Sequence, residues 1–407
     1  MKVIENGTVT SPKGYKGAGL HIGIKKKNKD FALIVSDVEA KSAGTFTTNM
    51  VKAAPVLWDK KIVEEYDSVK AIAINSGIAN ACTGDLGLKS NEEFASIVGN
   101  ALNVDKEKVL ICSTGVIGKQ LPTKPISEGI DSAVEMLSDS NEAGIDVATS
   151  IKTTDTKAKH IAVEIEIDDK VVTLGACCKG SGMIHPNMAT MLGFITTDLN
   201  ISKELLNKAL KEVIVDTFNM VSVDRDTSTN DTVLLLANGL ANNKEIVEED
   251  DNYQIFKDAL YYVNEYLAKC IAGDGEGATK LLEINVANAK DVKQAKIIAK
   301  SVCTSPLVKT AVYGNDANWG RLLCAMGYSG EEFDPYQVDL YIESEFGNLK
   351  LVENGMATDY SEEIATKILS SEYVKANIDM KIADGKATAW GCDLTYDYVK
   401  INADYRS

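Results

Sequence analysis

The stretch Lys179-Gly-Ser-Gly-Met-Ile-His-Pro-Asn-Met-Ala-Thr190 runs directly into Met191-Leu-Gly-Phe-Ile195, an apolar run typical of a buried strand. The first part is rich in glycine and ends in Ala189-Thr190. A small residue followed by threonine at the start of a strand can mark a peptide bond that the protein cuts itself. Cleavage would free the α-amine of Thr190, which could then act as general base for the hydroxyl of the same residue. The alternative is a glycine loop that leads into a core strand.

Around this stretch, the composition is that of a globular protein with a large core. The 407 residues are 45% apolar and 25% charged, which predicts two or three domains or one large entangled domain. The 59 acidic and 43 basic side chains give a formal net charge of −16, which argues against nucleic-acid and anionic-membrane partners. The sequence has neither a signal-peptide pattern at its start nor an apolar run of the roughly 18 to 20 residues that span a bilayer. We therefore expect a cytoplasmic protein.

Cysteine and histidine offer few catalytic or metal-binding arrangements. The eight cysteines have no C-x-x-C pair and no zinc spacing, so we expect reduced, structural thiols and no metal. A reactive thiol at Cys177-Cys178 is the less favoured alternative, because the adjacent Lys179 could lower a thiol pKa. Of the three histidines, His21 and His160 fall in or beside predicted strands and are expected to be structural, whereas His185 lies in the glycine-rich stretch.

Strand and helix patterns alternate along the chain without a Pro/Gly/Ser linker, which predicts an α/β or α+β fold with soft domain boundaries. Residues 163–167 and 171–176 form a predicted hairpin. We also expect a strand at 20–24, a helix over 92–102 capped by Asn91, and a second hairpin at Asp384-Gly385.

Four further segments carry more glycine, threonine and acid than a fold requires. Thr114-Gly115, at the end of a predicted strand, could present a hydroxyl and a backbone N–H as an oxyanion hole, where each donor contributes about 3 to 4 kcal/mol. The hydroxyls and carboxylate of Thr153-Thr-Asp-Thr156 could hold an amino acid. Glu276, between glycines, could receive an ammonium group. Residues 399–407 keep apolar and aromatic side chains almost to the end, which suggests a docked terminus. Ordinary turns and caps are the alternative for the first two, and a metal loop without the EF-hand ligand pattern is the alternative for the third.

Taken together and in this order, these segments resemble the glutamate N-acetyltransferase (ornithine acetyltransferase) family of arginine biosynthesis, over essentially the whole chain. Residues 224–232 and 314–321 add to the resemblance, while Arg225 and the terminal Ser407 are small departures. The resemblance implies an α/β fold of layered sheets flanked by helices, like that of self-processing aminopeptidases with an N-terminal nucleophile, plus a smaller C-terminal α+β domain.

The resemblance also implies self-cleavage between Ala189 and Thr190. The products would be an alpha chain, 1–189, and a beta chain, 190–407. Within the beta chain, about 190–280 would complete the catalytic core and about 281–407 would form the C-terminal domain. Two alpha and two beta chains would form a heterotetramer.

For the reaction, the resemblance implies that Thr190 carries an acetyl group from N2-acetylornithine to glutamate, with Thr114 and Gly115 as oxyanion hole and without cofactor or metal. The positions that match substrate-binding residues are Thr153, Lys179, Thr190, Glu276, Asn402 and Ser407. Some members of the family also accept acetyl-CoA as donor. Two alternatives stay open: an aminopeptidase or amidase that uses water as acceptor, and a non-catalytic amino-acid-binding protein with an inert Thr190.

Overall fold

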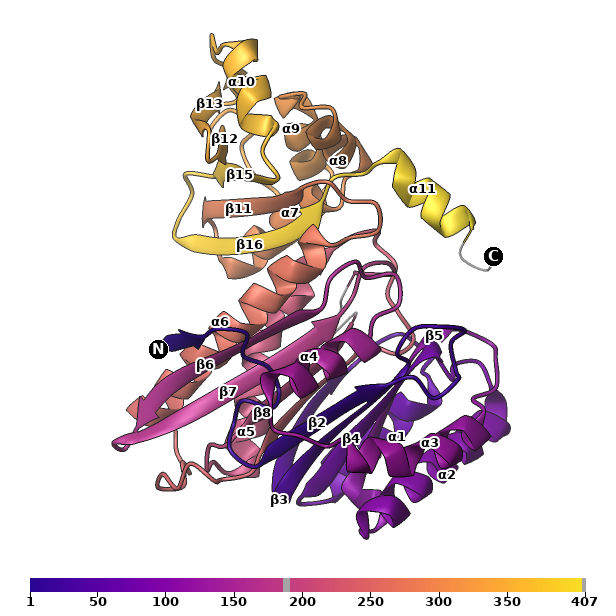
Figure 1. Cartoon of the computed structure of the whole chain (residues 1–407). Coiled ribbons are helices and arrows are strands. Elements are labelled where there is room, and N and C mark those ends of the chain that lie inside the picture. The colour runs from indigo at the N-terminus through magenta and orange to yellow at the C-terminus, as the bar shows by residue number, and fades with distance from the viewer. Residues whose placement is uncertain (186–190, 405–407) are drawn as a thin grey trace. The chain divides into compact units, whose positions relative to one another are not determined.

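The computed structural model describes residues 1–185 and 191–404, so Ala189, Thr190 and Ser407 lie outside the described residues. The chain divides into two compact units (Figure 1). Unit 1 contains Met1–Gly180, residues 191–219 and Thr227–Leu267, and unit 2 contains Ser181–His185, Met220–Asp226 and residues 268–404. Helix α6 (Asp251–Gly273) contains the boundary between residues 267 and 268. Within the described ranges, no helix is long and apolar enough to cross a membrane.

Unit 1 is built on a sheet with nine strands in the described chain, in the order β1-β6-β7-β8-β10-β3-β4-β5, with β2 also paired to β3. Its strands are β1 (Lys2–Ile4), β2 (Tyr15–Leu20), β3 (Phe31–Phe46), β4 (Val69–Ile78), β5 (Val109–Val116), β6 (Lys159–Ile167), β7 (Lys170–Lys179), β8 (Leu192–Thr197) and β10 (Thr232–Ala237). The long β3 pairs with β2 and β4 through its first half and with β10 through its second half. One strand therefore joins two layers.

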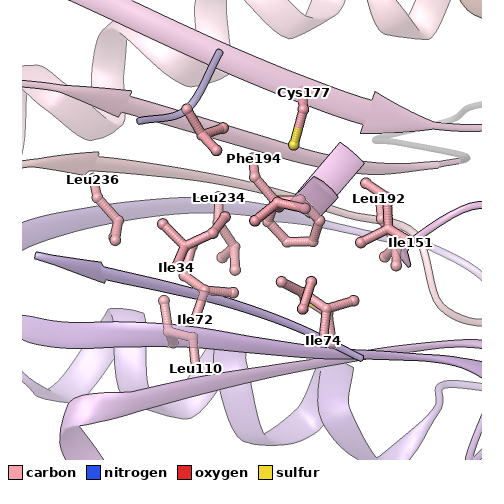
Figure 2. Packing of buried hydrophobic residues seen from close by; sticks show 14 of the residues in the cluster. Ile34, Ile72, Ile74, Leu110, Ile151, Cys177, Leu192, Phe194, Leu234 and Leu236 are labelled. Atoms are coloured by element: carbon pink, nitrogen blue, oxygen red, sulfur yellow. The ribbon is translucent and has the colours of Figure 1, made fainter. Parts of the chain in front are cut away.

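The core of unit 1 lies between these layers. Figure 2 shows Cys177, Phe194 and Leu234 from β7, β8 and β10 facing Ile72 and Leu110 from β4 and β5. On the other face of β4 and β5, a second apolar cluster includes residues of two helices. The helices of unit 1, other than α6, are α1 (Ala54–Glu65), α2 (Gly84–Leu102), α3 (Thr123–Glu135), α4 (Asn141–Ser150) and α5 (Lys203–Asp216). The prediction of layered sheets flanked by helices is confirmed.

Unit 2 has a sheet of seven strands among the described residues, in the order β14-β13-β12-β15-β11-β16-β9. These are β9 (Val221–Ser222), β11 (Leu281–Ala289), β12 (Asp339–Ser344), β13 (Gly347–Glu353), β14 (Met356–Ala357), β15 (Tyr373–Asp379) and β16 (Gly385–Cys392). Its helices are α7 (Val292–Cys303), α8 (Pro306–Tyr313), α9 (Trp319–Gly327), α10 (Glu362–Leu369) and α11 (Tyr396–Ala403).

The hairpin predicted around residue 168 is confirmed. β6 and β7 pair antiparallel, and the turn residues Asp168 and Asp169 both have positive φ, as a two-residue type I′ turn requires. The second predicted hairpin, at Asp384-Gly385, is wrong. β11 lies between β15 and β16, parallel to the first and antiparallel to the second. The turn signal predicted that β16 pairs with β15, its neighbour in sequence. Instead, β16 pairs with β11, which is distant in sequence.

Two other local predictions are corrected. Helix α2 begins at Gly84 instead of residue 92, so Asn91 is a buried residue within the helix and caps nothing. The sequence pattern did not predict the first turns of α2, because they contain Gly84 and Gly87 and glycine is a poor helix former. At Gly87 a side chain is excluded, since a Cβ would lie 1.8 Å from Thr83 Oγ1. The strand expected at 20–24 ends at Leu20, and the buried Asp30 then accepts hydrogen bonds from the backbone N–H groups of Ile22 and Lys25.

Candidate active site

Strand β8 begins two residues after Thr190 and lies between β7 and β10. Just before the strand, the carbonyl of Met191 accepts a hydrogen bond of 2.9 Å from Thr232 N–H. Lys179, the last residue of β7, pairs directly with Leu192. The chain on the C-terminal side of the predicted cleavage point is therefore fixed inside the sheet, with Lys179 on the neighbouring strand.

Thr114 and Gly115 lie at the end of β5, where β5 pairs parallel with β4. Gly115 has φ +130°, and a Cβ at this position would lie 2.2 Å from the carbonyl carbon of Gly77. Only glycine fits such a close approach of two backbones. Asn230, just before β10, donates from Nδ2 to the carbonyls of Ala79 and Ser113, at 2.6 and 2.8 Å. This amide ties the end of β5 to the chain that enters β10, the neighbour of β8.

Thr153 and the end of β7 are joined by one buried carboxylate. Asp155 accepts hydrogen bonds from Thr153 N–H (3.0 Å), Gly180 N–H (2.6 Å) and Lys159 Nζ (2.8 Å). Burial alone would raise the pKa of Asp155, but the charges of Lys179 and Lys159 outweigh it and hold the pKa below its ordinary value. The structure therefore brings the predicted substrate residues Thr153 and Lys179 together around Asp155.

Lys25 is a residue of this region that sequence reasoning missed. Its Nζ donates to the Lys152 carbonyl at 2.6 Å, next to Thr153, and its Cγ lies 3.1 Å from the position of a Cβ on Gly77. Burial, together with the nearby charge of Lys179, lowers the pKa of Lys25 to about 8, although Asp30 and Asp155 oppose this shift. The only signal in the sequence was a run of three lysines, which is usually a solvated surface.

In unit 2, the structure brings Glu276 and Asn402 together. Asn402 Nδ2, on α11, donates to the Glu276 carboxylate at 2.8 Å. Gly182 lies against this carboxylate, since a Cβ there would be 2.3 Å from Glu276 Cδ. The buried Glu276 is thus enclosed on one side by a residue of the glycine-rich stretch. Among the described residues, the predicted docking of the C-terminus consists of hydrogen bonds and a ring contact between Tyr396 and Tyr313, and α11 buries none of its residues.

A model of the ArgJ family matches residues 16–407. The chain belongs to this family. It is similar to the arginine biosynthesis bifunctional protein ArgJ of Thermotoga neapolitana, with 50% identity over 97% of this chain and 99% of the relative. It is also similar to ArgJ 1 of Clostridium acetobutylicum, with 52% identity over 100% and 99% of the two chains. A crystal structure of ArgJ from Bacillus halodurans is 47% identical with a TM-score of 0.51, and covers 53% of this chain and 99% of its own.

Family membership confirms the resemblance seen in the sequence, and the family's predicted site residues fall into two groups. Unit 1 contains Thr114, Gly115, Thr153 and Lys179, and unit 2 contains Glu276 and Asn402. The predicted nucleophile and Ser407 lie outside the described residues.

The contacts of His21 and His160 and the pKa shifts of His185 and Cys177 indicate structural roles. His160 Nδ1 lies 2.9 Å from the Gly7 carbonyl, and His21 Nδ1 lies 2.9 Å from the Asn28 carbonyl. Burial, with the charges of Lys300 and Arg225, lowers the pKa of His185 to about 4, so this imidazole is neutral at neutral pH. Burial raises the pKa of the Cys177 thiol, which argues against the reactive-thiol alternative. In the part of the chain that the structure describes, no His/Cys/Asp/Glu group is arranged to hold a metal.

Proposed function

We propose that this chain is a self-processing acetyltransferase of arginine biosynthesis, which moves an acetyl group from N2-acetylornithine to glutamate through acetyl-Thr190. The observation that carries the proposal is the match to the ArgJ family over residues 16–407. Acetyl transfer in arginine biosynthesis follows from this membership. The word bifunctional in the relatives' names fits the use of acetyl-CoA as a second donor.

Self-cleavage creates the nucleophile. Thr190 Oγ attacks the carbonyl carbon of Ala189, the amide C–N bond breaks, and an ester forms in its place. Water then hydrolyses the ester, which leaves a carboxylate on Ala189 and a free α-amine and hydroxyl on Thr190. The solved Bacillus halodurans chain supports this step, because it covers 53% of this chain but 99% of itself. The predicted product 190–407 has 218 of the 407 residues, about the same share.

Acetyl transfer then proceeds in two half-reactions at one site. Thr190 Oγ attacks the acetyl carbonyl while its own α-amine takes the hydroxyl proton, and ornithine leaves with that proton on its nitrogen. The amine of glutamate next attacks the acetyl ester, the bond between carbonyl carbon and Thr190 Oγ breaks, and the hydroxyl regains a proton. Donors from Thr114 and Gly115 stabilise both oxyanions.

The same binding residues can serve both substrates because both are α-amino acids. Lys179 suits a carboxylate, and its neighbour Asp155 is already paired with Lys159, at 2.8 Å. Glu276 suits an ammonium group, while Thr153, Asn402 and Ser407 offer hydrogen bonds. The cleaved chains stay together as a cytoplasmic heterotetramer of two alpha and two beta chains.

Denaturing electrophoresis combined with a transfer assay tests this function. We expect two fragments, the second starting at Thr190, and transfer from N2-acetylornithine to glutamate that outruns hydrolysis. Thr190→Ala should give one full-length band and no transfer. Hydrolysis that dominates in the presence of glutamate would identify an amidase instead. An uncut wild-type chain that binds amino acids without turnover would identify a binding protein.

A further inference from the structure

The residues that precede the predicted cleavage point are held by residues that follow it in sequence. Ser181–His185 belongs to unit 2, although β7, which ends one residue before Gly180, belongs to unit 1. Every tether described below comes from residues 222–276. After a cut at Ala189-Thr190 these tethers would therefore join two separate chains.

Asp224 makes the principal tether. Its carboxylate accepts two hydrogen bonds from adjacent backbone N–H groups, from Met183 at 2.6 Å and from Ile184 at 2.8 Å. Val223 N–H donates in return to the Ile184 carbonyl at 2.7 Å. Met183 has φ +56°, a left-handed conformation that costs a non-glycine residue free energy unless its surroundings impose it. The two bonds to one carboxylate impose this turn.

Two further tethers lie on either side of this turn. Ser181 Oγ donates to the Asp274 carbonyl at 2.7 Å, and Glu276 N–H donates to the Ser181 carbonyl at 3.1 Å. On the other side, His185 Nδ1 lies 3.0 Å from Ser222 Oγ. The segment is thus fixed at its first, middle and last residues.

We infer that Asp224 is a positioning residue for self-cleavage, which holds the turn at Met183 and Ile184 and so fixes where the chain leads into the segment that is cut. The inference rests on the self-cleavage proposed above. Misplacement of a reacting group by about 1 Å can slow a reaction by roughly 100-fold. Loss of the turn is therefore expected to slow the cleavage without abolishing it. After the cut, the same bonds retain the end of the first chain against the second.

Cleavage kinetics of freshly synthesised protein test the inference. In a pulse-labelled cell-free synthesis, we expect Asp224→Asn to lengthen the half-time of cleavage by about 10-fold or more, because the amide supplies one acceptor oxygen where the carboxylate supplies two. Asp226→Asn is the matched control, since Asp226 is exposed and is expected to keep the wild-type half-time. Equal half-times for Asp224→Asn and wild type, with equal melting temperatures, would overturn the inference.

A second measurement separates local positioning from a general loss of stability. In the Thr190→Ala background, which cannot cut, hydrogen exchange of the Met183 and Ile184 amides should be slow, and adding Asp224→Asn should accelerate it without changing exchange in β8. Unchanged exchange at these two amides would also overturn the inference. Failure of the proposed function looks different, because the wild-type chain itself would then stay uncut.

Discussion

At the scale of single residues, the buried Asp155 organises the candidate site residues of unit 1. Its side chain and that of Lys159 are 0% and 1% exposed, and the carboxylate also accepts two backbone N–H groups. The negative charge of Asp155 is thus held by Lys159 and two backbone N–H groups, with the charge of Lys179 nearby. Under the proposed function, the Lys179 ammonium is the group that binds the carboxylate of a substrate.

Asp155→Asn should lower the free energy of unfolding by about 3 to 5 kcal/mol, because it removes the carboxylate that is buried against the Lys159 charge. Urea unfolding measures this, and Glu128→Gln in the exposed Lys124–Glu128 pair is the control, with no measurable change expected. Because the pKa of Asp155 is lowered in the folded state, its stabilisation is complete above the unfolded pKa of about 4 and is lost as pH falls below that. Equal unfolding free energies for wild type and Asp155→Asn at pH 7 would contradict this role.

Lys25 gives a pH prediction of the same sign as Asp155, in a higher pH window. Its pKa is about 8 in the folded chain and about 10.4 when unfolded, so between these values the unfolded chain binds one more proton. The stability of wild type should therefore rise with pH across this window relative to Lys25→Met, by about 2 kcal/mol after allowance for partial exposure. Urea unfolding at pH 7.5 and 10 measures the difference, with Lys26→Met as exposed control. Parallel pH profiles for wild type and Lys25→Met would refute the depressed pKa.

Thr114 tests the oxyanion assignment. Removing one donor of such a hole costs about 3 to 4 kcal/mol of transition-state stabilisation, so Thr114→Ala should lower kcat by about 100- to 1,000-fold. Thr114→Ser keeps the hydroxyl and should retain most of the activity. A wild-type kcat in Thr114→Ala would remove this hydroxyl from the hole.

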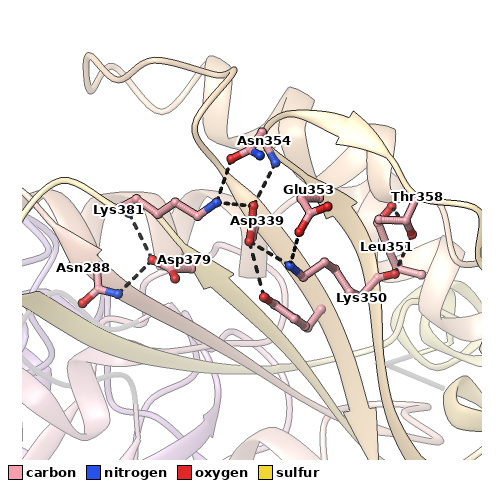
Figure 3. A network of polar contacts seen from close by, with 10 residues as sticks. Asn288, Asp339, Lys350, Leu351, Glu353, Asn354, Thr358, Asp379 and Lys381 are labelled. Atoms are coloured by element: carbon pink, nitrogen blue, oxygen red, sulfur yellow. Dashed lines mark hydrogen bonds and ion pairs between the residues drawn. The ribbon is translucent and has the colours of Figure 1, made fainter.

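At the scale of elements, the edge of the unit 2 sheet depends on one carboxylate (Figure 3). Asp339, at the start of β12, accepts hydrogen bonds from Lys350 Nζ on β13, from Asn354 N–H at 2.8 Å, and from Lys381 Nζ beyond β15. Burial would raise the pKa of Asp339, but the lysine partners outweigh it and lower the pKa to about 2. One residue thereby joins three successive segments of the sheet.

Asp339→Asn should therefore destabilise the fold by about 1 to 2 kcal/mol at pH 7, because the two lysine partners are themselves one-third exposed and screened. The stabilisation is complete above about pH 4 and is lost as pH falls through 2, which acid titration of wild type against Asp339→Asn can follow. Identical acid unfolding of the two proteins would show that the network contributes nothing.

Elements were predictable where their signals are local. The Asp168-Asp169 turn closes the hairpin that the sequence predicts. The sequence could not show that β11 inserts between β15 and β16, because a partner about 90 residues away leaves no trace beside Asp384-Gly385. The sequence offered the Asp155 carboxylate only as a possible substrate ligand and did not single out Lys25, because the contacts of both residues are created by the fold.

At the scale of the whole molecule, self-cleavage is proposed to free Thr190, which then acts as the nucleophile in acetyl transfer. The site residues Thr114, Gly115, Thr153 and Lys179 precede the cut, whereas Glu276 and Asn402 follow it. If these residues act as proposed, both cleaved chains are required for activity. Family membership was predictable because the ordered motifs span the chain, and the family match over residues 16–407 agrees.

Intact-mass measurement of the denatured enzyme, after incubation with N2-acetylornithine and without glutamate, tests the central claim most directly. We predict two chains, 1–189 and 190–407, with the second chain heavier by one acetyl group located on Thr190. Addition of glutamate should remove this group and yield N-acetylglutamate. A single uncut chain, or acetyl transfer that proceeds while Thr190 never carries the group, would contradict the account.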